Sequence, residues 1–171
     1  MSIFPEILTI KSKSDDVKIE LTILTESGAL AQLNKLDANS LPTSWSLRMV
    51  EWKKSDQPKQ LEDELARAHI SLIPSDPNDP RKNGVSHNRL IDSLRAGCIP
   101  IASPMDSYKE LDPSVILTNN FRDSLISVIN DYELVKSKIE RNRVNFMHRF
   151  SPSENERKWD QAVEILDGIT N

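Results

Sequence analysis

The sequence has little of what secreted and membrane proteins carry. It contains one cysteine, Cys98, which excludes an internal disulfide, and no group of Cys and His has the spacing of a zinc site. Its apolar runs stay well below the roughly 20 residues of a membrane-spanning helix. The first residues lack the basic and apolar blocks of a signal peptide. We therefore expect a cytoplasmic protein without a membrane span.

An excess of charge of one sign is absent too. The 22 Lys and Arg against 26 Asp and Glu give a formal net charge of −4, which disfavours nucleic acid as a partner bound through a broad basic surface. Aromatic residues make up 5% and hydrophobic residues 37% of the chain. Apolar blocks nevertheless recur between the charged residues, which is not typical of disorder. A length of 171 residues predicts about one domain.

Apolar periodicity predicts strands that alternate with helices over the first two thirds of the chain. The clearest strand lies at about residues 17–25, where side chains alternate with period two. Further strands are predicted near residues 47–52, 70–73, 99–102 and 115–117, and helices at residues 29–36, 61–68 and 90–96. This alternation predicts an α/β fold with a mostly parallel sheet and helices on both faces.

The last third of the chain changes character. Helical periodicity covers residues 121–130, 134–146 and 155–169, with breaks at Asp131-Tyr132 and at Ser151-Pro152-Ser153. We therefore expect residues 120–171 to form a C-terminal helical segment of the same domain.

A polar loop with three prolines, residues 74–84, lies between a predicted strand and a predicted helix. Such a loop is expected at the carboxyl end of a parallel sheet, where ligands bind in α/β folds. The helix after it is predicted to start near residues 86–88, with Ser86 or Asn88 as the N-cap residue. Free N–H groups at a helix start bind phosphate, and Arg81, Lys82 and Arg89 add positive charge nearby.

Two simpler interpretations of the same residues stay open. The loop is also compatible with a surface linker that its prolines stiffen. Arg89 and Asp92 also have the spacing of a solvated i,i+3 ion pair, worth a few tenths of a kcal/mol. Asp92 lies on the same helix face as Asn88 and Arg89, where its carboxylate could accept hydrogen bonds from a ribose.

A longer string gives these residues context. It runs from Ala68-His69-Ile70-Ser71-Leu72-Ile73-Pro74 through Lys82 to Ser86-His87-Asn88-Arg89-Leu90-Ile91-Asp92-Ser93-Leu94-Arg95-Ala96-Gly97-Cys98-Ile99-Pro100-Ile101-Ala102-Ser103. This string resembles the C-terminal, donor-binding half of glycosyltransferases with the GT-B fold. Ser107-Tyr108-Lys109-Glu110-Leu111 looks like the loop after the next strand of that family, and residues 150–159 look like its closing helix. The resemblance covers roughly residues 60–165.

The resemblance implies a Rossmann-like domain and a set of donor-binding residues. Asp92 matches the acidic position that holds the nucleotide ribose. The expected contacts with the donor diphosphate are Arg81, Lys82, Ser86, Asn88 and Arg89. The family has a glutamate near the donor sugar where this chain has Gly84, so Lys82 or Ser86 is expected to take over part of that contact. Gly84 and His87 are the remaining candidates for contact with the sugar.

The expected function is therefore that of a glycosyltransferase domain that binds a nucleotide diphosphate sugar as substrate, with no other cofactor and no metal. The resemblance covers one half of such an enzyme and lacks its first strand. An N-terminal acceptor domain or a partner chain is therefore expected, with the chain as a fragment or as a subunit that needs a partner. The alternative is a non-catalytic α/β module that binds nucleotides or completes itself with a partner. No catalytic residue emerges.

The remaining residues with chemical potential receive structural interpretations. Cys98 is expected to be an inert core thiol, because no activating base stands beside it in the sequence. Asp76 and Asp79 are expected to initiate turns rather than bind a metal. The three tryptophans are expected to pack against apolar neighbours. They are Trp45, Trp52 and Trp159.

Overall fold

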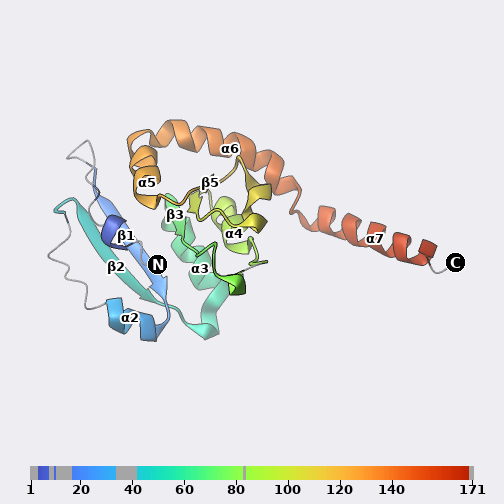
Figure 1. Ribbon diagram of the computed structural model, residues 1–171, viewed down its shortest axis with the longest axis horizontal. Helices are drawn as coiled ribbons and strands as arrows, with labels where there is room; N and C mark the ends of the chain where they lie inside the picture. The colour runs from blue at the N-terminus through green and yellow to red at the C-terminus, as the bar shows by residue number, and fades with distance from the viewer. Residues whose placement is uncertain (1–3, 8–9, 11–16, 34–41, 83, 170–171) are drawn as a thin grey trace.

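The computed structural model describes residues 4–7, 10, 17–33, 42–82 and 84–169. Within these ranges the chain has an α/β fold whose strands are all parallel to their neighbours, which confirms the predicted fold class. The strands are β1 (Ile19–Thr25), β2 (Trp45–Glu51), β3 (Ile70–Ile73), β4 (Ile99–Ala102) and β5 (Ile116–Leu117). Each lies close to a predicted range (Figure 1).

Helices separate these strands and form the whole C-terminal segment. They are α1 (Phe4–Ile7), α2 (Ser27–Leu33), α3 (Gln57–Arg67), α4 (Asn88–Arg95), α5 (Phe121–Asn130), α6 (Tyr132–His148) and α7 (Pro152–Ile169). The predicted breaks at Asp131 and Ser151 are confirmed. Residues 34–36 of the helix predicted at 29–36 lie outside the described residues. None of the described helices is long and apolar enough to cross a membrane.

The centre of the core lies around β4. All four of its residues are buried. A strand that is covered on both faces is typically a continuous apolar run, and β4 has this pattern. Helix α4 contacts β3 and β4, while α5 and α6 also contact β4. Gly97 ends α4 with φ +81°, a backbone conformation that L side chains rarely adopt, and so turns the chain directly into β4.

The strands form two separate sheets, one with the order β1-β2 and one with the order β3-β4-β5. The sequence predicts one mostly parallel sheet, and the structure corrects this point. Among the described strands, β1 pairs only with β2, in a register that joins Ile19 to Trp45 and Thr25 to Glu51, and β3 pairs only with β4. Cavities separate β1 from β3, because residues of both strands line the same two cavities.

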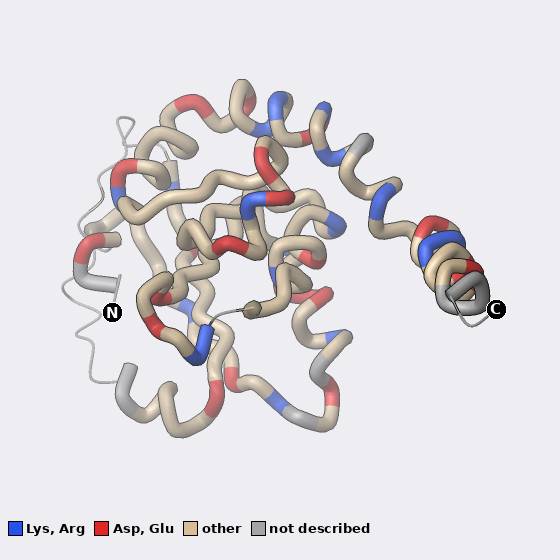
Figure 2. The backbone as a smooth tube through the Cα atoms, turned by 45° about the vertical axis from the view of Figure 1, so that its right-hand side comes forward, with Lys and Arg blue, Asp and Glu red and all other residues tan. Residues whose placement is uncertain are grey.

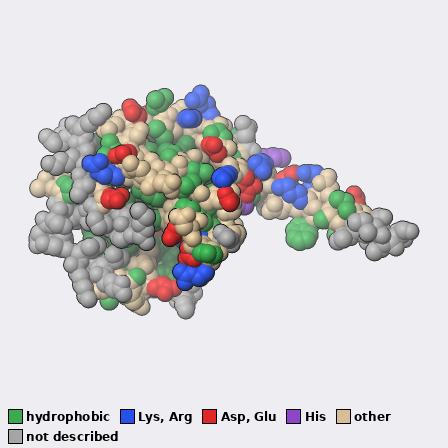
Figure 3. All heavy atoms as spheres, viewed as in Figure 1, with side chains coloured by type: hydrophobic (Ala, Val, Ile, Leu, Met, Phe, Trp, Pro, Cys, Tyr) green, Lys and Arg blue, Asp and Glu red, His purple; other side chains and the backbone are tan. Residues whose placement is uncertain are grey.

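Helix α7 extends away from the rest of the molecule (Figure 1). Its Trp159, Val163 and Ile165 are 73%, 51% and 63% exposed, and Figure 3 shows hydrophobic side chains on the surface of this helix. The expectation that Trp159 packs against apolar neighbours is therefore wrong. The pattern of apolar residues predicts the helix but does not reveal that these three side chains stay exposed. Trp45, in contrast, is 7% exposed and donates a hydrogen bond from Nε1 to the carbonyl of Ile10 at 3.0 Å.

Candidate functional site

The loop after β3 and the loop after β4 lie together at the carboxyl edge of the three-stranded sheet. The Ser103 hydroxyl accepts a hydrogen bond from the Ser75 N–H at 2.8 Å and donates one to the Ser75 carbonyl at 2.7 Å. The Ser107 hydroxyl donates to the Val85 carbonyl at 2.7 Å. These bonds hold the two loops in a fixed relation, as a binding site on loops requires.

A third contact joins the same loops at the start of α4. His87 Nδ1 lies 2.7 Å from Glu110 Oε1, and the His87 ring stands edge-on to Phe150 with 5.3 Å between ring centroids. Glu110 also forms an ion pair with Arg149, with 3.7 Å between Glu110 Oε2 and Arg149 Nη2. His87 was a candidate contact for the donor sugar, and the structure places it in this link between loops.

A polar cavity of about 230 Å³ lies between the two loops. Lys82 and Gly84 contribute to its wall from the first loop, and Pro104, Asp106 and Ser107 from the second. Gly84 has φ +75°, and a Cβ built there would meet nothing within 4 Å. The glycine is therefore required by the turn of the backbone rather than by close packing.

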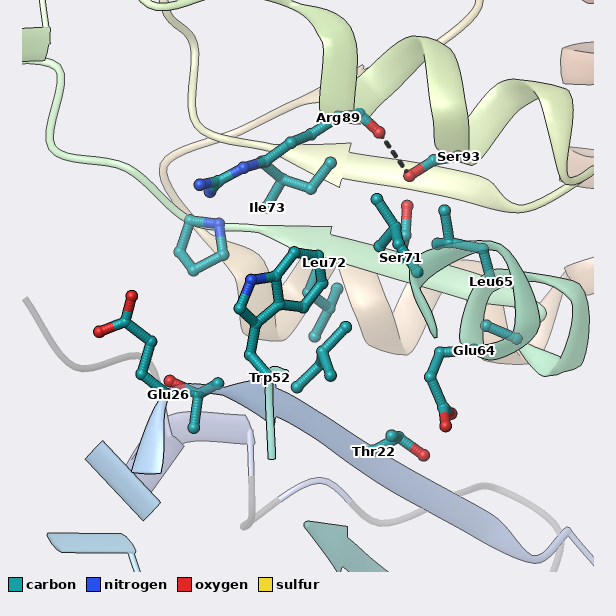
Figure 4. A pocket seen from close by; sticks show the side chains of 15 residues that line it. Thr22, Glu26, Trp52, Glu64, Leu65, Ser71, Leu72, Ile73, Arg89 and Ser93 are labelled. Carbon is teal, nitrogen blue, oxygen red and sulfur yellow. Dashed lines mark hydrogen bonds between the residues drawn. The ribbon is translucent and has the colours of Figure 1, made fainter. Parts of the chain in front are cut away.

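The first turn of α4 places a cation at this edge, while the N–H groups of Leu90 and Ile91 are already bonded to the His87 carbonyl. His87 is the N-cap residue, in place of the expected Ser86 or Asn88, and the Ser86 hydroxyl accepts from the Asn88 N–H at 3.2 Å. Arg89 is exposed and lines a larger cavity of about 580 Å³ that opens towards β1. Figure 4 shows its guanidinium extending over Ile73. Lys82 and Arg89 form no ion pair within the described residues.

Arg81 stands in the same loop but has an acidic partner. Its guanidinium donates to both oxygens of Asp79, at 2.9 and 2.8 Å, and these bonds lower the pKa of Asp79. Asp79 Oδ1 also accepts from the Arg81 N–H, and Asp76 Oδ1 from the Asn78 N–H at 2.9 Å. Both aspartates therefore stabilise local turns, as expected.

Asp92 does not pair with Arg89. It lies 3.6 Å from Arg95, with the two side chains 39% and 52% exposed. Asp92 is absent from the walls of the two cavities that contain Lys82 and Arg89. The structure thus places the two cations at the carboxyl edge of the sheet and Asp92 further along α4.

Cys98 is a buried thiol that donates weakly to the carbonyls of Leu65 and Ala68, both at 3.3 Å. Burial raises its pKa to about 11, so the reactive thiolate is scarce near neutral pH. This agrees with the expected inert thiol. Within the described ranges, no group of acidic, His and Cys side chains could hold a metal ion.

The links between the loops were not predicted from the sequence. Ser103 and Ser107 follow a strand as many loop serines do, and a single sequence contains no signal for their partners 28 and 22 residues away. Charge alone does not single out this edge of the sheet either, because Figure 2 shows residues of both charge signs spread along the chain, α6 and α7 included.

Comparisons of the chain with models of protein families, with curated proteins and with solved structures found no match in any of the three.

Proposed function

We propose that the chain is a glycosyltransferase domain that binds the diphosphate of a nucleotide diphosphate sugar at the carboxyl ends of β3 and β4. One observation carries the proposal: the loop after β3 exposes Lys82 and the first turn of α4 exposes Arg89, and neither cation forms an ion pair among the described residues. Unpaired cations beside a helix start are suited to phosphate oxygens. The order of strand, loop, helix and strand also agrees with the family that the sequence resembles.

The chemistry assigned to these residues is electrostatic. When the bond between the sugar and the diphosphate breaks, negative charge grows on the leaving diphosphate. Positive groups fixed in place before the reaction stabilise that charge in the transition state. Lys82 and Arg89 supply such groups. The acceptor and the group that deprotonates it are not part of the proposal.

The remaining expected donor contacts are proposed to contribute less to binding. Asp92 is assigned to the ribose, since its ion pair with Arg95 is half exposed and costs little to give up. Ser86 and Asn88 lie at the entry to α4. Arg81 reaches a diphosphate only by leaving Asp79. We therefore expect Lys82 and Arg89 to contribute most of the affinity.

Calorimetric titration of the purified chain with UDP and GDP tests the proposal. We expect one of the two to bind and Arg89→Ala to weaken it roughly tenfold or more, because a hydrogen bond to a charged group contributes about 1.5–3 kcal/mol. Arg141→Ala is the matched control, since Arg141 is an exposed arginine on α6 whose one bond among the described residues is to the Ser137 carbonyl. Equal affinity of the two variants, or no binding to the folded chain, would refute the proposal.

A second candidate, a module completed by a partner chain, is favoured by the space between β1 and β3.

A further inference from the structure

The facing edges of β1 and β3 carry backbone groups that pair with no other strand among the described residues. Ile19 donates to Ser44 and Trp52 donates to Thr25, so the odd-numbered residues of β1 bond to β2. Backbone groups alternate in direction along a strand. The N–H and C=O groups of Glu20, Thr22 and Leu24 therefore point away from β2, towards β3.

The same argument applies to β3. Ile99 donates to the carbonyl of His69, and Ser103 donates to that of Ile73, so the odd-numbered residues of this segment bond to β4. The backbone groups of Ile70 and Leu72 consequently point towards β1. Within the described residues no strand pairs with either edge.

Two adjacent cavities separate these edges, with volumes of about 580 and 430 Å³. They share four lining residues: Thr22, Glu64, Ala68 and Leu72. We call this space the inter-sheet gap. In Figure 4, Thr22 of β1 and Leu72 of β3 lie on opposite sides of it.

The gap has a direction. The smaller cavity is lined by Lys18 and the first half of β1, and by His69 and the start of β3. The larger is lined by the second half of β1 with Glu26, and by the end of β3 with Pro74. Both strands therefore run the same way along the gap, so a strand between them would be parallel to both.

The walls of the gap define what fits. Leucine and isoleucine side chains from β1, β3, α3 and α5 form most of their apolar part: Ile19, Leu21, Leu24, Leu61, Leu65, Ile70, Leu72, Ile73, Leu125 and Ile129. Charged side chains line the same two cavities: Lys18, Glu20, Glu26, Arg48, Glu64, Arg67 and Arg89. A parallel strand covered on both faces is a nearly continuous apolar run. Ser71 contributes a buried Oγ that has no hydrogen-bond partner among the described residues.

The 171 residues contain no spare run of this kind. Residues 11–16 are all polar or charged, and residues 34–41 have no two adjacent apolar residues. Ile7 and Ile10 are both 1% exposed in the core, so the ends of the apolar run at residues 7–10 already have another place. A second copy of the chain offers the same sequence and hence no free strand.

We propose that the inter-sheet gap binds an extended, apolar strand of a separate partner polypeptide, which inserts parallel to β1 and β3 and joins the two sheets. Its backbone would bond to both open edges at once, a mode of recognition known as strand addition. The proposal does not depend on nucleotide binding, because the contacts that it uses are backbone groups of β1 and β3.

Synthetic peptides test the proposal. Each has about six central residues drawn from Val, Ile, Leu and Ala, with lysines at both ends for solubility. We expect calorimetry to detect binding of at least one peptide to the chain with a stoichiometry of one. Thr22→Pro removes an N–H that faces the gap and leaves the bonds to β2 in place, so it is expected to weaken binding roughly tenfold.

Thr22→Val is the matched control, because it keeps the N–H and the side-chain shape and is expected to preserve affinity. Circular dichroism establishes that both variants fold. Equal affinities for the two variants would overturn the proposal, since the peptide would then bind elsewhere. Failure of every peptide to bind the monomer would overturn it in favour of a gap closed by the chain itself. A dimer in light scattering that Thr22→Pro dissociates would overturn it in favour of a second copy.

Discussion

Two buried serines show how a hydroxyl can either stabilise or destabilise this fold. Ser103 is 4% exposed and makes two hydrogen bonds to Ser75, which link the loops after β3 and β4. Ser71 is 9% exposed, and its Oγ has no partner within the described chain. A buried polar atom without a hydrogen bond costs about 1–3 kcal/mol. The two residues should therefore respond in opposite ways to the same substitution.

We expect Ser71→Ala to raise the free energy of unfolding by about 1 kcal/mol and Ser103→Ala to lower it by about 1–3 kcal/mol. The first change removes an unpaired hydroxyl, and the second leaves the backbone groups of Ser75 without their partner. Urea denaturation followed by circular dichroism measures both values. A loss of stability in Ser71→Ala would show that its hydroxyl is bonded in the free protein.

Single residues also show why the candidate site was only partly predictable. Arg81, Lys82 and Arg89 can be found from the sequence, because charge beside a predicted helix start is a local signal. Which of them forms an ion pair cannot be found from the sequence. That Arg81 pairs with Asp79, while Arg89 forms no ion pair among the described residues, depends on side-chain geometry. Likewise, the sequence suggests Arg89–Asp92 as an ion pair, while the structure pairs Asp92 with Arg95.

Among the elements, β1 and β4 were easy to predict for different reasons. β1 alternates polar and apolar residues because one of its faces is less buried, and β4 is apolar throughout because helices cover both faces. The pairing of strands was harder to predict. The alternation of strands with helices implies a parallel sheet, but it contains no information on whether β1 and β3 are neighbours or are separated.

Across the inter-sheet gap, the two sheets are linked by Arg48 of β2. Its guanidinium donates to Glu64 of α3, through Nη1 at 3.1 Å and through Nη2, and to Glu20 of β1 at 3.3 Å. Hydrogen bonds from Arg48 lower the pKa of Glu64, whose side chain is only 16% exposed. The pair therefore joins the β1-β2 sheet to the helix that precedes β3.

The link to Glu64 predicts a pH dependence. Because its pKa is lowered in the folded state, Glu64 stabilises the fold above its unfolded pKa of about 4.3, and that stability is lost as the pH falls below this value. Glu64→Gln should lower the free energy of unfolding by about 2 kcal/mol at pH 7.

Urea denaturation of both proteins at several pH values between about 3 and 7 measures this effect. The difference in stability between wild type and Glu64→Gln should shrink towards the acidic end of this range. A difference that stays constant with pH would contradict the assigned role of the ion pair.

On the scale of the whole molecule, the parallel sheet is interrupted at the point where it would otherwise be continuous. In open α/β sheets, ligands bind outside the carboxyl ends of the strands. Arg89 and Trp52 lie at the corresponding end of the inter-sheet gap, as Figure 4 shows. A strand in the gap would therefore complete one wall of the proposed donor site as well as the sheet.

Amide hydrogen exchange of the free chain, resolved by residue with NMR, tests the open sheet most directly. The account predicts an alternating pattern in β1: slow exchange at Leu21 and Ile23, which bond to β2, and fast exchange at Thr22 and Leu24, which face the gap. Slow exchange at all four amides in a monomeric chain would contradict the account, because the edge of β1 would then already be paired.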